Sequence, residues 1–452
     1  MRFIQSIHDV SSLCPPTSFE FASQRIPIAW VEQSLAATKT ASIRRRKLPA
    51  EQVVWLVIGM ALFRDRSIHA VVEQLGLAHD DAGGGRGSVV AASVAEARSR
   101  LGAEPMRILF EKTASAWTAD SIEQDRWHGL GVRVLDGTTI SVPDTPENHA
   151  HFGRPGTSRG GPSAYPKARL VALSAPRTHL LAALAIGKYR DGELAMAEQL
   201  RPHIPDQSIT IVDRGFLAYP TLNKLHDAQR ERHWLTRAKT TSAWRRIKRL
   251  GRDDELVQMR FSPQARKADP SLPEKFTARA IRYQRRGFKP QHLLTSLVDP
   301  VKYSAAEIVA LYHERWEIEL AFDEKKTHLL ERQETLRSKT EQGVQQEIWG
   351  LAIAYNLIRL MMARVAAQAG VPPLRISFWN SLLTIRNFML MAWHDAPGTL
   401  PRLLASLLRQ MRLLILPPRR LRSSPRQVKI KMSNYPKKPP LPHSRSKSER
   451  VH

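Results

Sequence analysis

Three acidic residues stand at positions where metal-dependent chemistry is possible. Asp136 lies in the apolar stretch VRVLDGTTISV, Asp213 ends the apolar stretch SITIVD, and Glu319 lies in the helical stretch LYHERWEIELAFDEKK. Clustered carboxylates are the ligands that Mg²⁺ or Mn²⁺ prefers, and two such ions about 3.5 to 4 Å apart support displacement at phosphorus. An apolar core has no structural use for three carboxylates, because they repel one another unless a cation is present. The trio therefore predicts a metal site.

Each aspartate also has a purely structural interpretation. Asp136 precedes Gly137 and could close a turn, while Asp213 could pair with the adjacent Arg214. Both aspartates, however, lie on buried apolar strands, and the stretch around Glu319 supplies positive groups beside its own acid. Taken together, these features favour one shared site over separate structural roles.

Residues 311–326 carry more charge than a helix needs for solubility. At about 100° per residue, four polar side chains fall within an arc of about 60°; they are Tyr312, Arg315, Glu319 and Lys326. A guanidinium and an ammonium group beside a carboxylate can hold a phosphate backbone, and the tyrosine hydroxyl adds a donor. The alternative is that Arg315 and Glu319 form an ordinary i,i+4 surface pair, contributing about 0.2 to 0.5 kcal/mol.

The same helical wheel predicts two further faces. An apolar stripe beside the polar one should dock the helix on the core; it consists of Leu311, Ile318, Phe322 and Leu329. A third set of charged residues should face solvent on the far side; it consists of Glu314, Glu317, Glu324 and Lys325. The polar stripe is thus expected at the margin of the core.

The charge of the chain predicts a polyanionic partner. The 452 residues carry a formal charge of +27, with a pI near 10.7, which favours nucleic acid over an anionic membrane surface. The longest apolar run, residues 53–63, is far shorter than the ~20 residues that span a bilayer, so we expect no membrane segment. The N-terminus lacks the apolar region of a signal peptide, so we expect a cytoplasmic protein associated with DNA.

Cysteine and histidine usage limits the kind of metal site. The single cysteine, Cys14, excludes a disulfide framework and any cysteine-based zinc site. The 16 histidines show no H-E-x-x-H pattern. If a metal is bound, oxygen atoms must hold it.

The first 125 residues predict a helical domain. Three helices are expected at PAEQVVWLVIGMALF, SIHAVVEQL and SVAEARSRLG. In the third, Ser93 and Glu96 have capping-box spacing and Gly102 stands where a C-cap belongs. With Arg98 and Arg100 on its last turn, this group could form a helix-turn-helix-like DNA reader; a plain helical bundle with a basic face fits equally well.

The period changes to that of strands from residue 132. Strands are expected at VRVLDGTTISV, ARLVALSA, HLLAALAIG, SITIVDRGF and HWLTRAK, with helices at DGELAMAEQL and YPTLNKLHDA. Three consecutive strands followed by alternating helix and strand give a mixed α/β sheet covered by helices. This order matches a ribonuclease H-like core.

The rest of the chain divides by composition into further segments. We expect an N-terminal helical domain over 1–125, the first part of the core over 126–240, a β-rich insertion over 241–302, the second part of the core over 303–370 and C-terminal helices over 371–416. A basic tail covers 417–452, with eleven Lys or Arg, one Glu and seven prolines. The tail should be disordered when free and able to lie along phosphate, or it is a solvated terminus with no specific role.

Two tryptophans are candidates for stacking on an unpaired base. Trp244 begins the insertion, and Trp316 follows Arg315 in the charged helix. The alternative, a place in the core, is the commoner one for a lone tryptophan.

At these residues the chain resembles the DDE transposases of the insertion-sequence 4 family. YHERWEIELAFDEKK satisfies the family signature Y-x2-R-x3-E-x6-K at Tyr312, Arg315, Glu319 and Lys326. VLDGTTISVPDTPEN and IVDRGF resemble the family's two aspartate motifs. SVAEARSRLG and LPAEQVVWLVIGMALFRDRS resemble its N-terminal domain, so the resemblance covers most of the chain.

The resemblance implies a ribonuclease H-like core interrupted by a β insertion before the glutamate. It implies Asp136, Asp213 and Glu319 as the metal-binding triad for two Mg²⁺ ions, with Mn²⁺ as a substitute. Tyr312, Arg315 and Lys326 become contacts to the DNA end. The expected partners are the terminal inverted repeats, target DNA and a second copy of the chain in a dimeric synaptic complex. The alternatives are a ribonuclease H-like nuclease without strand transfer and a DNA-binding protein that no longer cuts.

Overall fold

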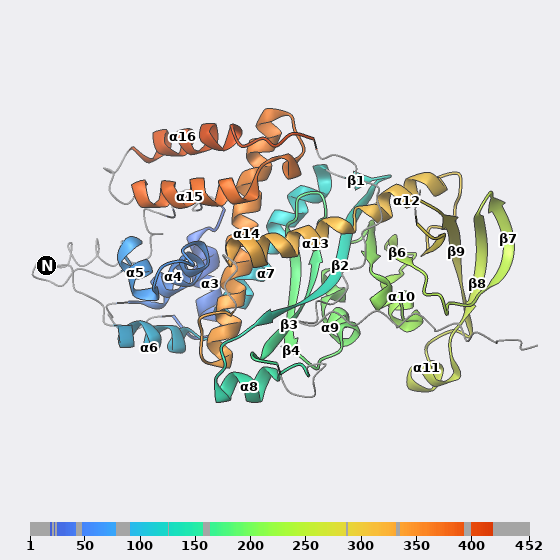
Figure 1. Cartoon of the computed structure of the whole chain (residues 1–452), viewed down its shortest axis with the longest axis horizontal. Coiled ribbons are helices and arrows are strands. Elements are labelled where there is room, and N and C mark those ends of the chain that lie inside the picture. The colour runs from blue at the N-terminus through green and yellow to red at the C-terminus, as the bar shows by residue number, and fades with distance from the viewer. Residues whose placement is uncertain are drawn as a thin grey trace, which may run out of the picture.

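The computed structural model describes residues 19, 22, 25–41, 48–77, 91–124, 126–156, 163–285, 288–330, 335–392 and 399–418. The expectations for the N-terminus, Cys14, the loop at 80–88 and the tail from residue 419 lie outside these residues. Figure 1 shows the N-terminal helices at one end of the molecule, a large sheet in the middle and the insertion at the other end.

Within the described residues a mixed ten-stranded sheet runs through the molecule (Figure 1). The strands are β1 (Arg126–Trp127), β2 (Leu130–Ser141), β3 (Lys167–Ser174), β4 (Leu181–Lys188), β5 (Ser208–Val212), β6 (Arg232–Arg237), β7 (Arg245–Gly251), β8 (Asp254–Arg260), β9 (Lys275–Tyr283) and β10 (Gln291–Thr295). Their spatial order is β4-β3-β2-β5-β6-β10-β9-β8-β7, and β1 pairs with β2 alone. Strands β2, β5 and β6 are parallel, while the other pairs are antiparallel. This is the predicted ribonuclease H-like arrangement.

The strands of the insertion extend the core sheet. Strand β10 pairs with β6, and β9, β8 and β7 follow outward in antiparallel order. Within this insertion, the period-two stretches ELVQMRFS, FTARAIRYQ and HLLTSLVD predict β8, β9 and β10, whereas the charges of RRIKRLG hide the period of two in β7. A helix, α11 (Pro263–Ala268), joins β8 to β9.

Apolar side chains form one buried cluster on each face of the sheet. The smaller cluster lies under α9 (Glu193–Leu200) and α10 (Tyr219–Leu225). The larger cluster joins the other face of the sheet to the N-terminal helices and to those that follow β10. The N-terminal helices therefore share a core with the sheet.

The N-terminal helices are α3 (Ile28–Ala37), α4 (Ala50–Leu62), α5 (Ile68–Gln74), α6 (Ala91–Leu101) and α7 (Glu104–Gln124). Helix α4 is buried at nearly every position, and Ser67 caps α5 by accepting from the backbone N–H of Ala70. The predicted capping box of α6 is wrong, because the helix begins at Ala91 and Ser93 lies inside it. Gly102, which was predicted to cap the C-terminus of this helix, has a φ of +71°, a conformation that favours glycine.

Two long segments connect the sheet to the rest of the molecule. The first is α12 (Ala305–His313), α13 (Trp316–Asp323) and the π-helical turn η4 (Glu324–Leu329), which cross the sheet in Figure 1. The sequence predicted one regular helix here. Instead, the backbone N–H groups of Glu314 and Arg315 bond three residues back, to Leu311 and Tyr312, which ends α12. The turn η4 is wound more loosely than an α-helix.

The second segment is α14 (Glu341–Ala369), which packs against α4, α7 and η4. Among the described residues α14 alone is long and apolar enough to cross a membrane, but most of its apolar window is buried inside the molecule. It is the central core helix. The remaining elements are α8 (Pro146–Phe152), η2 (Arg201–His203), η3 (Arg214–Phe216), η5 (Pro373–Arg375), α15 (Phe378–Ala392) and α16 (Leu400–Arg412).

Helices α4 and α14 approach closely at Gly350. A Cβ atom at Gly350 would lie 2.8 Å from the carbonyl oxygen of Val57 and 2.6 Å from one of its methyl carbons. The backbone of Val57 cannot yield as a side chain would, so glycine at this position sets how closely the N-terminal helices pack on the core.

We therefore expect Gly350→Ala to destabilise the protein. Alanine is the better helix former by about 1 kcal/mol, but the forced separation of two packed helices costs about 1 to 3 kcal/mol, so a net loss is expected. Urea unfolding followed by circular dichroism measures it. As a control, Gly156→Ala places a Cβ with nothing within 4 Å and should change the unfolding free energy by less than about 0.5 kcal/mol; equal effects of both changes would contradict the close-approach argument.

Candidate functional site

Strand pairing brings the two aspartates together. Leu135 of β2 and Val212 of β5 are partners in a parallel pair, and Asp136 and Asp213 are the next residues along each chain. Asp136 is inside β2 and not at a turn, and the backbone N–H of Gly137 donates to its Oδ1 at 2.8 Å. In the described part of the chain no ion pair joins Asp213 to Arg214. The structural interpretations of the two aspartates are therefore not realised.

Arg315 joins Asp136 to the glutamate. Its Nη1 lies 3.7 Å from Oδ2 of Asp136, and its Nη2 donates to Oε1 of Glu319 at 2.7 Å. The side chains of Arg315 and Asp136 are 15% and 18% exposed, whereas that of Glu319 is 38% exposed. The site is thus half-buried and open on the side of the glutamate.

The acids affect one another electrostatically. The pKa of Asp136 is raised to about 6, chiefly by burial and to a smaller extent by the negative charges of Asp213 and Glu319, while the Gly137 N–H and Arg315 act in the opposite direction. A carboxyl group that resists ionisation in this way is typical of a site built to bind a cation.

The acids do not form a ready-made metal cluster. Over the ranges that the structure describes, no three Asp, Glu, His or Cys side chains are grouped as a closed set of ligands. Arg315 lies between Asp136 and Glu319 and supplies the positive charge there. Carboxylate oxygens nevertheless fit a hard divalent ion, and Asp213 and Glu319 are among the charges that raise the pKa of Asp136, although burial is the largest cause.

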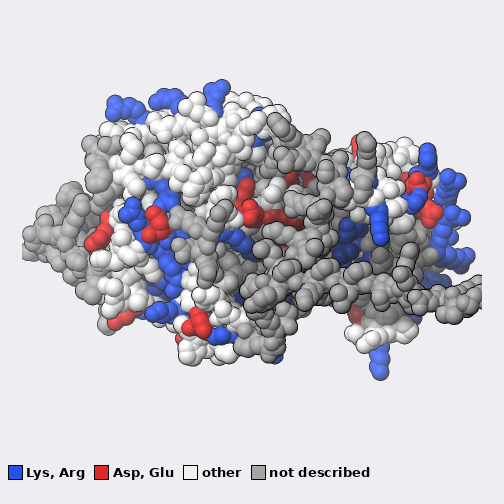
Figure 2. All heavy atoms as spheres, in the orientation of Figure 1, with Lys and Arg blue, Asp and Glu red and all other residues white. Residues whose placement is uncertain are grey.

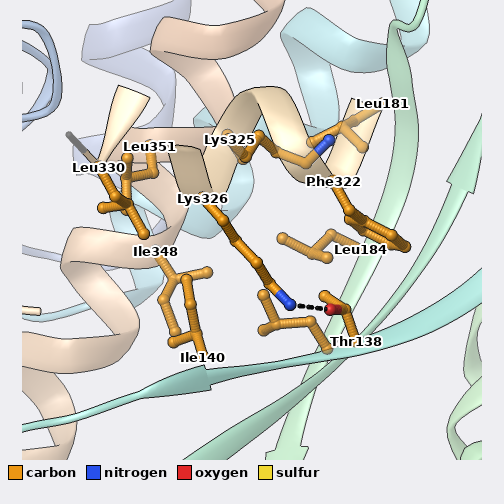
Figure 3. A pocket seen from close by; sticks show the side chains of 12 residues that line it. Thr138, Ile140, Leu181, Leu184, Phe322, Lys325, Lys326, Leu330, Ile348 and Leu351 are labelled. Carbon is orange, nitrogen blue, oxygen red and sulfur yellow. Dashed lines mark hydrogen bonds between the residues drawn. The ribbon is translucent and has the colours of Figure 1, made fainter. Parts of the chain in front are cut away.

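Lys326 lies against the same strand. Its Nζ donates to Oγ1 of Thr138 at 2.5 Å (Figure 3). Thr138 is two residues beyond Asp136, on the same face of β2 and about 7 Å along it. Burial lowers the pKa of Lys326, and the nearby Lys167 lowers it further. The ammonium group of Lys326 therefore lies about 7 Å along β2 from Asp136, with the neutral Thr138 as its hydrogen-bond partner.

Tyr312 is less accessible than the sequence suggested. It is only 6% exposed and belongs to the core. Burial raises its pKa, and Arg315, Arg237 and Asp213 are among the charges that influence it. The structure thus brings Tyr312 to the acids as a buried neighbour.

The four residues expected to face solvent form buried contacts instead, so that prediction was wrong. Glu314 accepts two hydrogen bonds from Arg177, each 2.8 Å long. Glu317 and Glu324 contact the two ring nitrogens of His179 at 3.0 and 3.2 Å. The predicted apolar stripe of the same helical wheel is buried, at Leu311, Ile318, Phe322 and Leu329. The far side is covered as well, because Arg177, His179 and α14 pack against it.

Glu324 is the centre of this buried cluster. It also accepts from the Tyr355 hydroxyl at 2.8 Å and pairs with Arg359 of α14. Although burial raises the pKa of Glu324, Arg359 and His179 lower it well below its usual range. His179 is buried and has a φ of 62°, a conformation that few residues other than glycine adopt. The cluster fixes the π turn that carries Lys326.

Lys325 is the second lysine of this turn. Burial lowers its pKa to about 7, and among the described residues its Nζ has no hydrogen-bond partner. The Nζ lies 4.1 Å from the ring centre of Tyr355. Lys325 and Lys326 both line a mostly apolar cavity of about 40 Å³ (Figure 3), too small for a nucleobase.

Arg98 is not available as a DNA reader. Its guanidinium donates to Gln346 and Ser338, each at 2.9 Å. Ser338 also bonds the buried Glu347, which pairs with Arg64. Arg98 therefore ties α6 to α14, and of the two arginines proposed for a helix-turn-helix only Arg100 remains exposed, beside Glu96.

The two tryptophans differ in exposure. Trp316 is 45% exposed beside Arg315, whereas Trp244 is half-buried and packs edge-on against His292 at a centroid distance of 5.4 Å. Of the two, Trp316 keeps a surface on which a base could stack.

The chain matches two family models. Residues 16–111 match the model described as "Insertion element 4 transposase N-terminal", and residues 127–357 match "Transposase DDE domain". The chain is 37% identical over 410 residues to "Transposase InsG for insertion sequence element IS4" of Escherichia coli (strain K12), covering 90% of this chain and 91% of that protein.

Among solved structures the chain is similar to the piggyBac transposase synaptic complex with hairpin DNA. The identity is 12% and the TM-score is 0.41, with 91% of this chain and 87% of that chain covered. The fold assignment rests on the sheet order and the family models.

We expect Asp136→Asn to stabilise the metal-free protein at high pH. Because the pKa of Asp136 is raised to about 6 in the folded state, its ionisation costs about 3 kcal/mol well above pH 6, and this cost disappears as the pH falls toward the unfolded value. The stability gained by the variant should therefore be largest near pH 8 and about 2 kcal/mol smaller near pH 4.5. Urea unfolding at the two pH values measures it, and a gain independent of pH would contradict the assignment.

We expect Arg359→Leu to destabilise the protein by about 3 to 5 kcal/mol, because Glu324 would stay buried without its main counter-charge. Removing both charges in Arg359→Leu with Glu324→Leu should recover part of the loss. Chemical unfolding of the single and double variants measures the coupling, and additive effects would show that the two side chains do not depend on each other.

Proposed function

Because the chain belongs to the insertion element 4 family of DDE transposases, we propose that it cuts and joins DNA at Asp136, Asp213 and Glu319. Its function is the transposition of an insertion sequence. The observation that carries the proposal for the site is the single guanidinium of Arg315, which contacts Asp136 on the sheet and Glu319 on α13.

The three carboxylates are the groups that would hold divalent ions, Mg²⁺ in the first instance with Mn²⁺ as a substitute. Such ions supply activation of the attacking oxygen and stabilisation of the leaving oxygen at phosphorus. The oxygen-only donor set supports this choice of metal.

The other side chains of the site hold the DNA. Arg315 presents a planar fork of donors that suits a phosphate group, and it is within reach of both acids. Lys326 adds a positive charge about 7 Å along β2 from Asp136. Tyr312 is buried and interacts electrostatically with Arg315, and its hydroxyl is the further donor that we assign to the strand end.

The partners of the reaction follow from transposition. We infer that the chain binds the terminal inverted repeats, with the N-terminal helices of 1–125 contributing to end binding, and that two copies hold two ends in a synaptic complex. We place the protein in the bacterial cytoplasm on nucleoid DNA. The net charge of +27 supports association with DNA.

A strand-transfer assay tests the proposal. The substrates are Mg²⁺, DNA with the inverted repeats that flank the gene, and a target plasmid. Asp136→Asn, Asp213→Asn and Glu319→Gln should each lower cleavage roughly 100-fold or more while end binding remains. Asp144→Asn changes an exposed acid that pairs with Arg154 outside the site and should cut normally.

The same assay separates the alternatives. Nicking without joined products would indicate a nuclease, and a retarded band without cleavage by the unmodified chain would indicate a DNA-binding protein that does not cut. Normal cleavage by Glu319→Gln would overturn the assignment of the site.

We expect Lys326→Ala to weaken end binding and to reduce the salt dependence of binding by about one phosphate contact. Lys224→Ala is a matched control, because Lys224 lies on α10 over the opposite face of the sheet. Binding titrations at several salt concentrations compare the two variants. Equal slopes for Lys326→Ala and the unmodified chain would remove Lys326 from the site.

A further inference from the structure

We propose that Arg245 and Lys248 on β7, the outermost strand of the sheet, bind the phosphate backbone of the DNA duplex that leads away from the acidic site. The inference rests on the proposed function, since it takes the acids as the point at which the DNA is cut. It adds a second contact surface, which the sequence analysis did not detect because β7 itself was not predicted.

The insertion carries a large share of the charge of the chain. Residues 241–302 hold fifteen Lys or Arg and six Asp or Glu, a net charge of +9 in a chain of net charge +27. All five residues from Arg245 to Arg249 are exposed. Figure 2 shows Lys and Arg gathered at the right-hand edge of the molecule, where Figure 1 places β7.

Strand register places Arg245 and Lys248 on the face of the sheet that carries Asp136. Cross-strand partners point to the same face, and the partners can be followed from β2 outward. The chain of partners is Val134, Ile211, Leu235, Thr295, Arg279, Leu256 and Lys248. Asp136 is on the same face as Val134 because it is two residues further along β2. Arg245 is on the same face as Lys248 because its partner, Gln258, is two residues beyond Leu256 on β8.

The other two cations of β7 point to the opposite face. Arg246 pairs with Val257 and Arg249 with Glu255 in the register, and Val257 belongs to the cluster on the far side of the sheet. Arg246 also lies 3.3 Å from Glu255, and Arg249 donates to the carbonyl of Gly251. These two side chains already have partners within the protein.

By contrast, Arg245 and Lys248 form no ion pair within the described part of the chain. They are two charges without an ion-pair partner there, on the face of the acids. A bulge between Arg246 and Lys248 puts their partners Gln258 and Leu256 two residues apart, so the two cations lie about 7 Å apart along the strand. That spacing equals about two base pairs of duplex rise at 3.4 Å. An exposed cation pair with this spacing suits a polyanion with regular charges.

The distance from the acids fixes where the contact should fall. Strand β7 is six steps from β2 and five from β5, which at about 4.8 Å per step gives roughly 24 to 29 Å. At 3.4 Å per base pair this distance corresponds to about seven to nine base pairs from the cleaved phosphate. Twist of the sheet shortens the straight path, so these values are upper bounds.

A second use of the cations is protection of an edge strand. Charged side chains on an exposed edge prevent pairing with another chain. Edge protection requires charge on the strand but no particular face, whereas DNA binding requires the two cations on the face of the acids. The two ideas therefore predict different results for the two pairs of side chains.

The test uses the full chain and duplexes that carry one inverted repeat. The test variant is Arg245→Gln with Lys248→Gln, and the matched control is Arg246→Gln with Arg249→Gln, which removes the same charge from the same strand. The duplex arm on one side of the cleavage position is lengthened from four to twelve base pairs, first on the element side and then on the flanking side. Binding is titrated at several salt concentrations.

We expect the affinity of the unmodified chain and of the control to rise once one arm passes about seven to nine base pairs, and the arm that shows the rise identifies the DNA segment. The test variant should lack this rise, bind the long arm about tenfold less tightly, and lose about 1.8 from the salt slope. Cleavage of the shortest duplex should be the same for all three proteins.

Other outcomes overturn the inference or its premise separately. If the test variant shows the same rise as the unmodified chain, β7 does not bind the duplex. If it binds normally but self-associates in sedimentation, its cations protect the edge. If the unmodified chain cuts no duplex of any length, the proposed function fails, whatever the binding curves show.

Discussion

Repulsion between carboxylates that the backbone holds side by side is the constraint on which the rest of the site depends. The parallel register of β2 and β5 brings Asp136 and Asp213 to neighbouring positions, and α13 adds Glu319. Burial and like charge raise the pKa of Asp136 to about 6. Arg315 offsets part of this repulsion, and a bound cation would offset the rest. Such a site favours a divalent cation, and a phosphate can approach the carboxylates only beside positive groups such as Arg315.

The carboxylates stay in place because the helix that carries Glu319 is anchored on its other side. Glu314, Glu317 and Glu324 are held by Arg177 and His179, and Arg359 pairs with Glu324 from α14. A buried ionic cluster of this kind contributes little net stability compared with apolar packing, but breaking it is costly. Its effect is to fix one arrangement of α13 and η4. Since α14 also packs against α4, the N-terminal helices and the helix that carries Glu319 rest on the same core helix.

The insertion is part of this framework and not an appendage. Because β10 pairs with β6, strands β7 to β10 continue the sheet that holds the acids. A charge on β7 is therefore placed at a defined number of strands from Asp136, and the distance follows from the sheet spacing. Because the insertion continues the sheet, its net charge of +9 is held at one end of the molecule.

The sequence by itself determined the family, the strands of the core and the residues proposed for the site. Asp136, Asp213 and Glu319 could be proposed because acids on apolar strands and a periodic charged helix are local patterns, and the strands of the core could be found from their period of two. Tertiary structure decided what the other charges do. Glu324 and Lys325 are half-buried because His179 and the side chains of α14 pack against the side of the helix that was expected to face solvent. Arg98 is bonded to Gln346 and Ser338, residues about 240 positions away, and the two faces of β7 acquire meaning only through a register that runs across seven strands. Contacts between residues far apart in the chain depend on packing, which residue spacing along one segment does not encode.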